Sequence, residues 1–319
     1  MKSISYIGFY DLSQYSSEKR SCSLAATTKM EYISDVLTEL GYSVRIVSPS
    51  GTRCRQFVWF RGRRSLLNKN TELFLGPTFG SPFAGLRFLS LCMSFLWLTF
   101  WMLRNTGRGE TVVVYHEPLL AIPIWLVKTI LGCHILLEVE EIYFDAKSIG
   151  RQRSHLEQFL IQCADGFVLS TELLAERLSS NIQDKECIFC YGSYRTQPRL
   201  STPLIDGLIH VVYAGVVDEV KKGAFNAVEA ARSLSSKYVM HIIGFGTVEA
   251  MSRIKSLVDS VNSSDGGCPV LLTNAKSGSE YVKFMQKCHI GLSTQSMDGE
   301  YLSSSFPSKV LSYLSLIHI

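Results

Sequence analysis

Lysine and glycine residues could bind a phosphate group in one stretch of the chain, Ile209–Phe245. The apolar runs Ile209–Tyr213 and Tyr238–Ile243 are typical of buried strands, and glycine follows each of them. Lys222 comes directly before Gly223 and an amphipathic helix pattern, so positive charge would lie beside the free backbone N–H groups of a helix N-terminus. A diphosphate could bind there, although an ordinary strand-to-helix turn with solvated lysines would show the same pattern.

Histidine and glutamate residues follow two other apolar runs that we expect to be strands. His116 comes directly after Thr111–Tyr115, and Glu138 and Glu140 lie at the end of His134–Val139. The carboxyl ends of parallel strands meet at one edge of a sheet, so we expect these side chains to face the same cleft. There they could orient a sugar hydroxyl or move a proton, whereas a lone residue of these types elsewhere is usually structural.

Alternating strand and helix patterns predict an α/β protein with two Rossmann-like domains. We expect the first domain at residues 1–195, where the loop Asp11–Ser23 lacks the glycine pattern of dinucleotide binders and so counts against a nicotinamide or flavin enzyme. Residues 196–207 contain two prolines and no periodicity, which predicts an interdomain linker. Residues 208–319 repeat the alternation and form the second domain.

Two segments of the first domain could contact a membrane. Residues 53–64 carry five arginines among aromatic side chains, which could rest on anionic lipid headgroups or hold a lipid pyrophosphate, or could form a solvated strand edge and loop. Gly85–Leu103 is apolar and long enough to span a bilayer. It contains Arg87, however, and it leads into Thr111–Tyr115, a strand that the same sheet needs. We therefore expect a buried or membrane-resting helix.

Composition excludes some functional classes. Of 319 residues, 46% are hydrophobic and 19% are charged, and the formal charge of +4 indicates a mildly basic globular protein rather than a nucleic-acid binder. The nine cysteines are scattered, as is typical of reduced thiols. The close pair Cys187 and Cys190 has no further ligands at zinc spacing, so no metal site is expected. The first residues show no secretion leader, and we expect a cytoplasmic protein.

Several of these pieces, in this order, resemble the GT-B glycosyltransferases of the retaining family 4 type, especially the bacterial capsule and exopolysaccharide enzymes. The resemblance covers nearly the whole chain. Each motif alone is weak, and their order and spacing carry the resemblance. In chain order they are HEP at His116, YAG at Tyr213–Gly215, KKG at Lys221–Gly223, IIGFG at Ile242–Gly246, the turn Thr273–Asn274 and SFPSKVLSYLS at Ser305–Ser315.

The resemblance implies a hexosyltransferase that moves a sugar from an NDP-sugar to a glycan acceptor, lipid-linked in this family, at the inner face of the cytoplasmic membrane. His116 would orient the donor, and Glu138 or Glu140 would act near the acceptor. No cofactor or metal is implied, because lysines and helix N–H groups can stabilise the leaving diphosphate. The implied donor-binding residues are Gly215, Lys222, Gly223, Gly244, Gly246, Thr273, Asn274, Ser305, Phe306, Pro307, Lys309 and Ser312.

The sequence also departs from the family. The arginine usually found shortly before the phosphate lysine is absent from Val216–Asp218, serines at 304 and 312 replace two donor-site residues, and Arg20–Ser23 replaces a glycine pair. The chain ends at Leu316–Ile319 without the family's last elements, so we expect a truncated, poorly active chain. Two alternatives stay open. One is a catalytically inactive GT-B-like binding or assembly subunit, and the other is a different GT-B enzyme such as an NDP-sugar epimerase.

Overall fold

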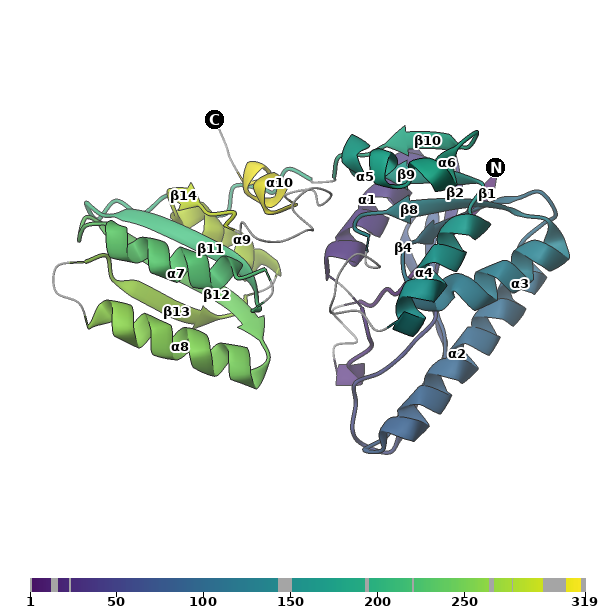
Figure 1. Ribbon diagram of the computed structural model, residues 1–319, viewed down its shortest axis with the longest axis horizontal. Helices are drawn as coiled ribbons and strands as arrows, with labels where there is room; N and C mark the ends of the chain where they lie inside the picture. The colour runs from purple at the N-terminus through teal and green to yellow at the C-terminus, as the bar shows by residue number, and fades with distance from the viewer. Residues whose placement is uncertain are drawn as a thin grey trace. The chain divides into compact units, whose positions relative to one another are not determined.

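Figure 1 shows the computed structural model of the chain, which divides into two compact units. The N-terminal unit is built on Met1–Ser193, and the C-terminal unit on Tyr194–Leu302 and Pro307–Ile319. The structure describes residues 2–12, 17–22, 24–142, 151–192, 195–219, 221–263, 267–276, 278–294 and 308–316.

An eight-stranded sheet forms the centre of the N-terminal unit, with strand order β10-β9-β8-β7-β1-β2-β5-β4. Neighbouring strands run parallel except for β4, which is antiparallel to β5, and a separate antiparallel pair joins β3 to β6. The strands are β1 Ser3–Ile7, β2 Ser43–Ser48, β3 Val58–Phe60, β4 Arg63–Asn68, β5 Thr71–Leu75, β6 Thr78–Gly80, β7 Thr111–Tyr115, β8 His134–Val139, β9 Gly166–Leu169 and β10 Glu186–Phe189.

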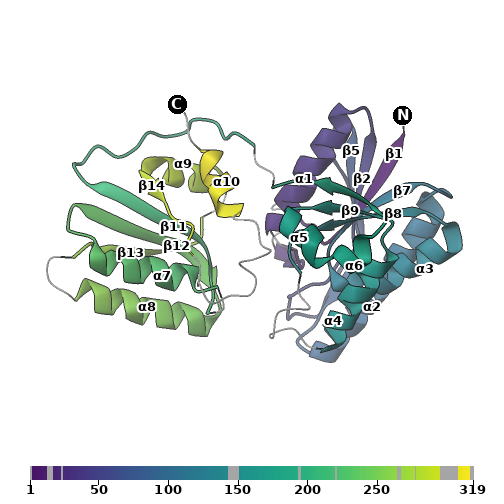
Figure 2. The same ribbon diagram turned by 45° about the horizontal axis from the view of Figure 1, so that its top comes forward.

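Helices cover both faces of this sheet (Figures 1 and 2). Because successive side chains of a strand point to opposite faces, β1 serves two cores: Tyr6 packs with Met30 of α1, and Ile7 belongs to the core that contains Leu98 of α2. Strands buried on both faces explain the near-continuous apolar runs in the sequence. The helices are α1 Leu24–Glu39, α2 Ala84–Asn105, α3 Ala121–Leu131, α4 Arg151–Cys163, α5 Glu172–Arg177, α6 Ser179–Ile182 and the 3-10 turn η2 Pro118–Leu120.

The apolar segment predicted at Gly85–Leu103 is the 22-residue helix α2. By its length and composition α2 could cross a membrane, but a core helix of a soluble protein can meet the same two criteria. It packs against β6 and α3 within the N-terminal unit, burying Ser90, Ser94, Leu98 and Met102. Its other face is exposed, so the helix is only partly buried, and the alternative that it rests on a membrane stays a prediction.

The C-terminal unit contains a four-stranded parallel sheet with order β13-β12-β11-β14. Helices α7 and α8 cover one face, and α9 and α10 lie on the other (Figures 1 and 2). The elements are β11 Ile209–Val217, α7 Gly223–Ala230, the 3-10 turn η3 Ala231–Ser233, β12 Tyr238–Gly246, α8 Val248–Asn262, β13 Val270–Asn274, α9 Gly278–Lys287, β14 Ile290–Gly291 and α10 Ser308–Leu314.

Strands β11 and β12 are longer than the apolar runs predicted. The glycines expected in loops after the strands lie inside the paired ladder, where Gly215 is opposite Gly244 and Val217 is opposite Gly246. The reason is close strand approach: a Cβ atom on Gly244 would lie 2.3 Å from the Gly215 carbonyl oxygen. Glycine therefore continues these strands rather than ending them.

The stretch 196–207, predicted as a linker, lies along α9 of the C-terminal unit. The Gln286 side chain donates to the Pro198 carbonyl oxygen at 3.0 Å and accepts from the Leu200 and Ser201 amides at 2.8 and 3.1 Å. The Leu204 amide donates to the Lys287 carbonyl oxygen at 3.1 Å. One buried glutamine thus satisfies the backbone of an aperiodic segment. The prolines in this stretch predicted a linker and gave no sign of these contacts with α9.

Candidate functional site

The turn between β11 and α7 has the geometry of an anion site. Lys222 is the N-cap of α7 and has a left-handed backbone, with φ of 51° and ψ of 16°. The following Gly223 is buried, and a Cβ atom there would lie 2.5 Å from the Tyr213 hydroxyl and 2.6 Å from the Thr294 carbonyl oxygen. Lys222 is exposed at the start of the helix. This arrangement favours a bound anion.

Asp218 stabilises the same turn. Its carboxylate accepts a hydrogen bond of 2.7 Å from the Lys221 amide. The segment Val216–Asp218, where the sequence lacks a second cation, therefore supplies a turn-stabilising acid instead. Positive charge must come from another part of the unit.

Lys309 of α10 is the candidate for that second cation. Its Nζ atom lies 5.0 Å from the centre of the Tyr213 ring, and its Cε atom packs against Gly215. Burial lowers the pKa of Lys309, the nearby charge of Lys221 lowers it further, and Asp218 partly opposes this. A cation whose charge is disfavoured by burial and by a second cation is stabilised when an anion binds. Lysines from two distant segments thus converge on one place.

Three predicted residues form a row at the carboxyl end of the sheet. Gly215, Gly244 and Asn274 are opposite one another on β11, β12 and β13. Thr273 is half-buried, and its hydroxyl donates to the Ile242 carbonyl oxygen at 3.4 Å. Two members of the row have no side chain, and the space beside them is filled by the Lys309 side chain at Gly215 and by the β11 backbone at Gly244. Asn274 is exposed and could contact a ligand.

The remaining donor predictions are less informative. Gly246 ends β12 and is exposed, and Ser312 is exposed on α10. Ser305, Phe306 and Pro307 lie outside the described residues, so their predicted role stays a prediction.

His116 follows β7 as predicted, but its side chain is buried in the N-terminal unit. Its Nε2 atom lies 3.1 Å from Oε1 of Glu157 on α4, and the two side chains are 1% and 0% exposed. Its amide donates to the Glu138 carbonyl oxygen at 3.0 Å, which joins the ends of β7 and β8. The structure therefore shows a buried polar contact of the imidazole with Glu157. The predicted contact with a donor sugar stays a prediction.

Glu138 and Glu140 lie near each other as predicted, in different environments. Glu138 is fully buried and accepts a hydrogen bond from the Tyr6 hydroxyl, while a quarter of the Glu140 side chain is exposed. Burial raises the pKa of Glu138 well above its usual range, and the charge of Glu140 adds to this rise. Because an acid–base group must reach its substrate, Glu140 fits a role beside the acceptor better than Glu138 does.

Lys29 of α1 joins these two glutamates, and the sequence reasoning missed it. Its Nζ atom contacts Glu140 Oε1, lies 3.8 Å from Glu138 Oε1 and donates to the Cys190 carbonyl oxygen at 3.1 Å. A signal was present, because a lysine four residues before Ile33 shares the apolar face of the predicted helix.

Arg20, which stands where the family has a glycine pair, is a buried structural residue. Its Nε atom lies 2.7 Å from Glu18 Oε2, and its Nη1 atom donates to the Gly76 carbonyl oxygen at 2.7 Å. It ties the loop after β1 to the end of β5 and is not available as a second donor-site cation.

A cavity of about 470 Å³ in the N-terminal unit is the candidate acceptor site. Its lining includes Tyr115 and Glu117 at the end of β7, together with Arg53, Arg87 and Arg153. Arg153 of α4 lies 2.9 and 3.1 Å from the two carboxylate oxygens of Glu117, which also accepts from the Leu119 amide. This geometry fixes the acid at the rim. Of these residues, the sequence pointed to Arg53, within 53–64, and to Glu117, in the HEP motif, as possible ligand contacts, whereas Arg87 counted only against a membrane span.

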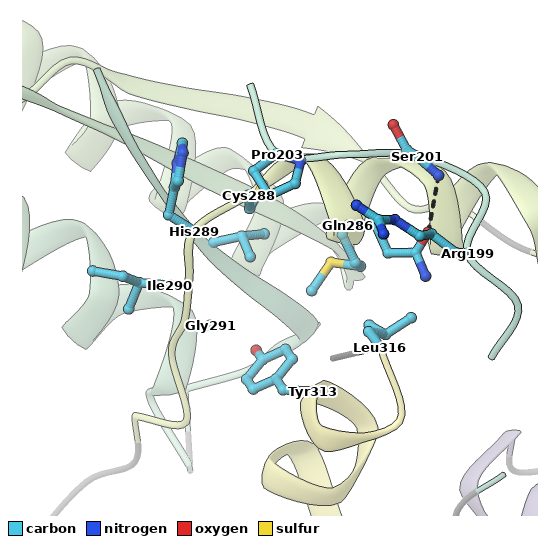
Figure 3. Close-up of a pocket in the computed structure, with 12 residues that line it drawn as sticks. Arg199, Ser201, Pro203, Gln286, Cys288, His289, Ile290, Gly291, Tyr313 and Leu316 are labelled. Carbon is cyan, nitrogen blue, oxygen red and sulfur yellow. Dashed lines mark hydrogen bonds between the residues drawn. The ribbon is translucent and has the colours of Figure 1, made fainter. Parts of the chain in front are cut away.

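A smaller cavity of about 270 Å³ lies beside β14 in the C-terminal unit (Figure 3). Met285, Cys288, Tyr313 and Leu316 give it an apolar lining. Burial raises the pKa of the Cys288 thiol to about 12, so the thiol stays protonated and is a poor nucleophile. Tyr313 donates to the Leu292 carbonyl oxygen at 2.7 Å. Arg199, Ser201, Gln286 and His289 add polar groups to this lining.

Solved structures share this fold, while the sequence matches no protein-family model and no curated protein. Sucrose-phosphate synthase from Thermosynechococcus elongatus has a TM-score of 0.65 at 12% identity, over 91% of this chain and 75% of that one. A UDP-forming trehalose-phosphate synthase from Burkholderia xenovorans, in complex with glucose-6-phosphate, has a TM-score of 0.64 at 10% identity, over 100% and 83%. The catalytic domain of starch synthase IV from Arabidopsis thaliana, bound to ADP and acarbose, has 0.58 at 9%, over 91% and 77%.

These likenesses define the class of fold. The chain has the GT-B fold of glycosyltransferases, with Rossmann-like units, and the predicted fold class is confirmed. At these identities the likeness concerns the fold, and activity must be argued from the site.

Proposed function

We propose that this chain is a glycosyltransferase that transfers a sugar from a nucleotide-sugar donor to a glycan acceptor. The observation that carries the proposal is the convergence of Lys309 on the α7 turn that holds Lys221 and Lys222. The names of the structural neighbours support it, because all three describe synthases that build or modify saccharides, and one was solved with ADP.

The proposed donor site stabilises charge that develops on the leaving diphosphate. As the glycosidic bond to the diphosphate breaks, negative charge grows on the bridging oxygen and spreads over the phosphates. Lys222 beside the N–H groups of α7, and Lys309 against Gly215, supply charge there without a metal or cofactor. Such charge-assisted contacts are each worth about 1.5–3 kcal/mol.

The finer parts of the proposal concern the acceptor and the place of action. We assign the enzyme to the family 4 type, with retention at the sugar carbon, and to bacterial surface polysaccharide synthesis on the cytoplasmic side of a membrane. The support is the ordered motif set around His116, Lys222 and Lys309, and the exposed apolar face of α2, which fits a lipid-linked acceptor and peripheral contact with anionic lipid.

Release of nucleoside diphosphate tests the function. The chain is incubated with UDP-, ADP- and GDP-sugars and a glycan acceptor, and diphosphate release is measured with and without the acceptor. Acceptor-dependent release supports transfer. Tight binding without turnover would instead indicate an inactive binding subunit, and conversion of the sugar without loss of the diphosphate would indicate an epimerase.

Lys222→Gln provides the matched test of the donor site. We expect weaker diphosphate binding and lower turnover, by about tenfold or more, because one charge-assisted contact is lost. Lys255→Gln, an exposed lysine on α8, is the control and should change neither. Equal donor affinity in wild type and Lys222→Gln would show that the diphosphate binds elsewhere.

A further inference from the structure

The cavity of about 270 Å³ beside β14, which we call the β14 cavity, has the size of a small-molecule site (Figure 3). Val212 of β11 and Met285 of α9 line its interior and are 1% and 5% exposed. An apolar cavity of about 150 Å³ is enough to bind benzene, so this one has room for a ring that carries a polar group.

One side of the β14 cavity is apolar and fixed in place. The Tyr313 ring of α10 packs directly on the β14 backbone, since a Cβ atom on Gly291 would lie 2.7 Å from this ring. The hydroxyl of Tyr313 donates to the Leu292 carbonyl oxygen at 2.7 Å, which sets the orientation of the ring. Leu316, whose amide donates to the Tyr313 carbonyl oxygen at 3.0 Å, extends the apolar side (Figure 3).

The stretch predicted as a linker forms the opposite side of the β14 cavity. The buried Gln286 side chain accepts from the Leu200 and Ser201 amides and so holds this stretch against α9. The Gln197 amide donates to the Ser315 carbonyl oxygen at 2.8 Å, which joins the same stretch to the end of α10. Both sides are therefore tied together without a ligand, and little ordering would be needed when one binds.

The described residues that line the β14 cavity include an arginine but no aspartate or glutamate. Arg199 is exposed, and its guanidinium has no hydrogen bond or ion pair with another described residue. His289, at the other end of the cavity in Figure 3, accepts a hydrogen bond of 3.0 Å on Nδ1 from the His210 amide. Its Nδ1 atom is therefore unprotonated, so His289 is a neutral Nε2–H donor and adds no charge.

This charge distribution favours a carboxylate. The planar guanidinium of Arg199 can bind both oxygens of one carboxylate, and the single charges of the two groups match. A phosphate monoester would bring a second negative charge next to apolar walls, where an uncompensated charge is costly. A neutral apolar compound would leave the guanidinium without a partner.

We propose that the β14 cavity binds a small organic acid, with its carboxylate on Arg199 and its apolar body against Tyr313 and Leu316. A sugar or a diphosphate lacks such a body, so this site goes beyond the proposed transfer reaction and does not depend on it.

Titration with benzoate, followed by ligand-observed NMR and without any nucleotide, tests the inference. Benzyl alcohol supplies the ring without the charge, acetate the charge without the ring, and phenyl phosphate a doubly charged head. We expect benzoate to bind at least about tenfold more tightly than each of them. Equal binding of benzyl alcohol would show a plain apolar cavity, and equal binding of acetate a plain anion site. Either result, phenyl phosphate binding as tightly as benzoate, or no binding of benzoate overturns the proposal.

Variants locate the carboxylate and the ring separately. Arg199→Gln should weaken benzoate binding about tenfold and leave benzyl alcohol binding unchanged, because only the charged contact is lost. Leu316→Gln should weaken the binding of both. Arg253→Gln, an exposed arginine of α8 paired with Glu219 at 2.7 Å, is the control and should change neither. Thermal unfolding checks that each variant folds, and unchanged benzoate affinity in folded Arg199→Gln contradicts the assignment.

Lys222→Gln separates the β14 cavity from the proposed diphosphate site, since benzoate is also an anion. Benzoate affinity should be the same in this variant as in wild type. If it falls, benzoate binds at the α7 turn and the inference is wrong. No step of these titrations involves sugar transfer, so they decide the cavity assignment whether or not the donor site passes its own test.

Discussion

Replacing Lys309 by methionine removes the converging cation while keeping the apolar stem that packs against Gly215. The ammonium group lies 5.0 Å from the centre of the Tyr213 ring, in a partly buried position where water weakens a phosphate contact less than at the surface. One charge-assisted contact is worth about 1.5–3 kcal/mol. We therefore expect Lys309→Met to raise the Kd for the preferred nucleoside diphosphate by about ten- to a hundredfold.

The pH dependence of binding distinguishes the charge from the shape of this side chain. The pKa of Lys309 in the free protein lies below the ordinary value of 10.5, chiefly because of burial. A bound anion favours the charged form, so diphosphate affinity is full below this pKa and falls as the pH rises through it. Lys309→Met should lack this alkaline fall.

Titration calorimetry with ADP, UDP and GDP measures both effects, with Lys255→Gln of α8 as the control for loss of a surface charge. Thermal unfolding of each variant checks that the C-terminal unit is intact. If folded Lys309→Met binds diphosphate within twofold of wild type, with the same pH profile, then Lys309 does not contact the diphosphate and the second cation is still missing from the site.

Three other outcomes follow from the structure. Gly223→Ala should destabilise the C-terminal unit by about 1–3 kcal/mol in urea unfolding, because its Cβ would overlap Tyr213 and Thr294. Gly267→Ala is the control and should not destabilise the unit, since no atom lies within 4 Å of the added Cβ. Equal effects of the two substitutions would refute the overlap argument. Lys29→Met should cost about 1–3 kcal/mol, because the largely buried Glu140 carboxylate loses its charged partner. A loss below about 0.5 kcal/mol would show that Glu140 does not depend on Lys29. Burial, together with the charge of His210, lowers the pKa of His241 from 6.5 to about 4, so the unfolded chain binds this proton more readily than the folded chain does. The contribution of His241 to folding stability is therefore full above about pH 6.5 and is lost as the pH falls toward 4. A flat profile of unfolding free energy against pH over this range would contradict this prediction.

Periodicity in the sequence was sufficient for the order of the elements, because buried parallel strands and their helices leave strong apolar patterns. Periodicity was insufficient to predict where strands end, because a glycine can either continue a strand or form a turn. Gly215 and Gly244 continue paired strands through a close approach of backbones, whereas Gly223 ends a turn, and the residue type alone does not separate these cases.

The site was partly predictable for a related reason. The position of Lys222 at the start of a helix could be predicted, since the local pattern includes the whole turn. The contacts of Lys29 with Glu140, and of Arg153 with Glu117, join segments 111 and 36 residues apart, and no local pattern reports such pairs. Burial of His116 and Glu138 likewise depends on helices that pack over the strand ends.

If Lys222 binds the diphosphate as proposed, its left-handed backbone sets stability against activity at a single position. A lysine in this conformation carries strain of about 1–2 kcal/mol, which glycine would relieve. Lys222→Gly should therefore give a protein that resists urea better while binding diphosphate more weakly. Selection for stability alone would remove the lysine, so stabilising screens of this chain should recover changes at position 222, and screens that require activity should exclude them.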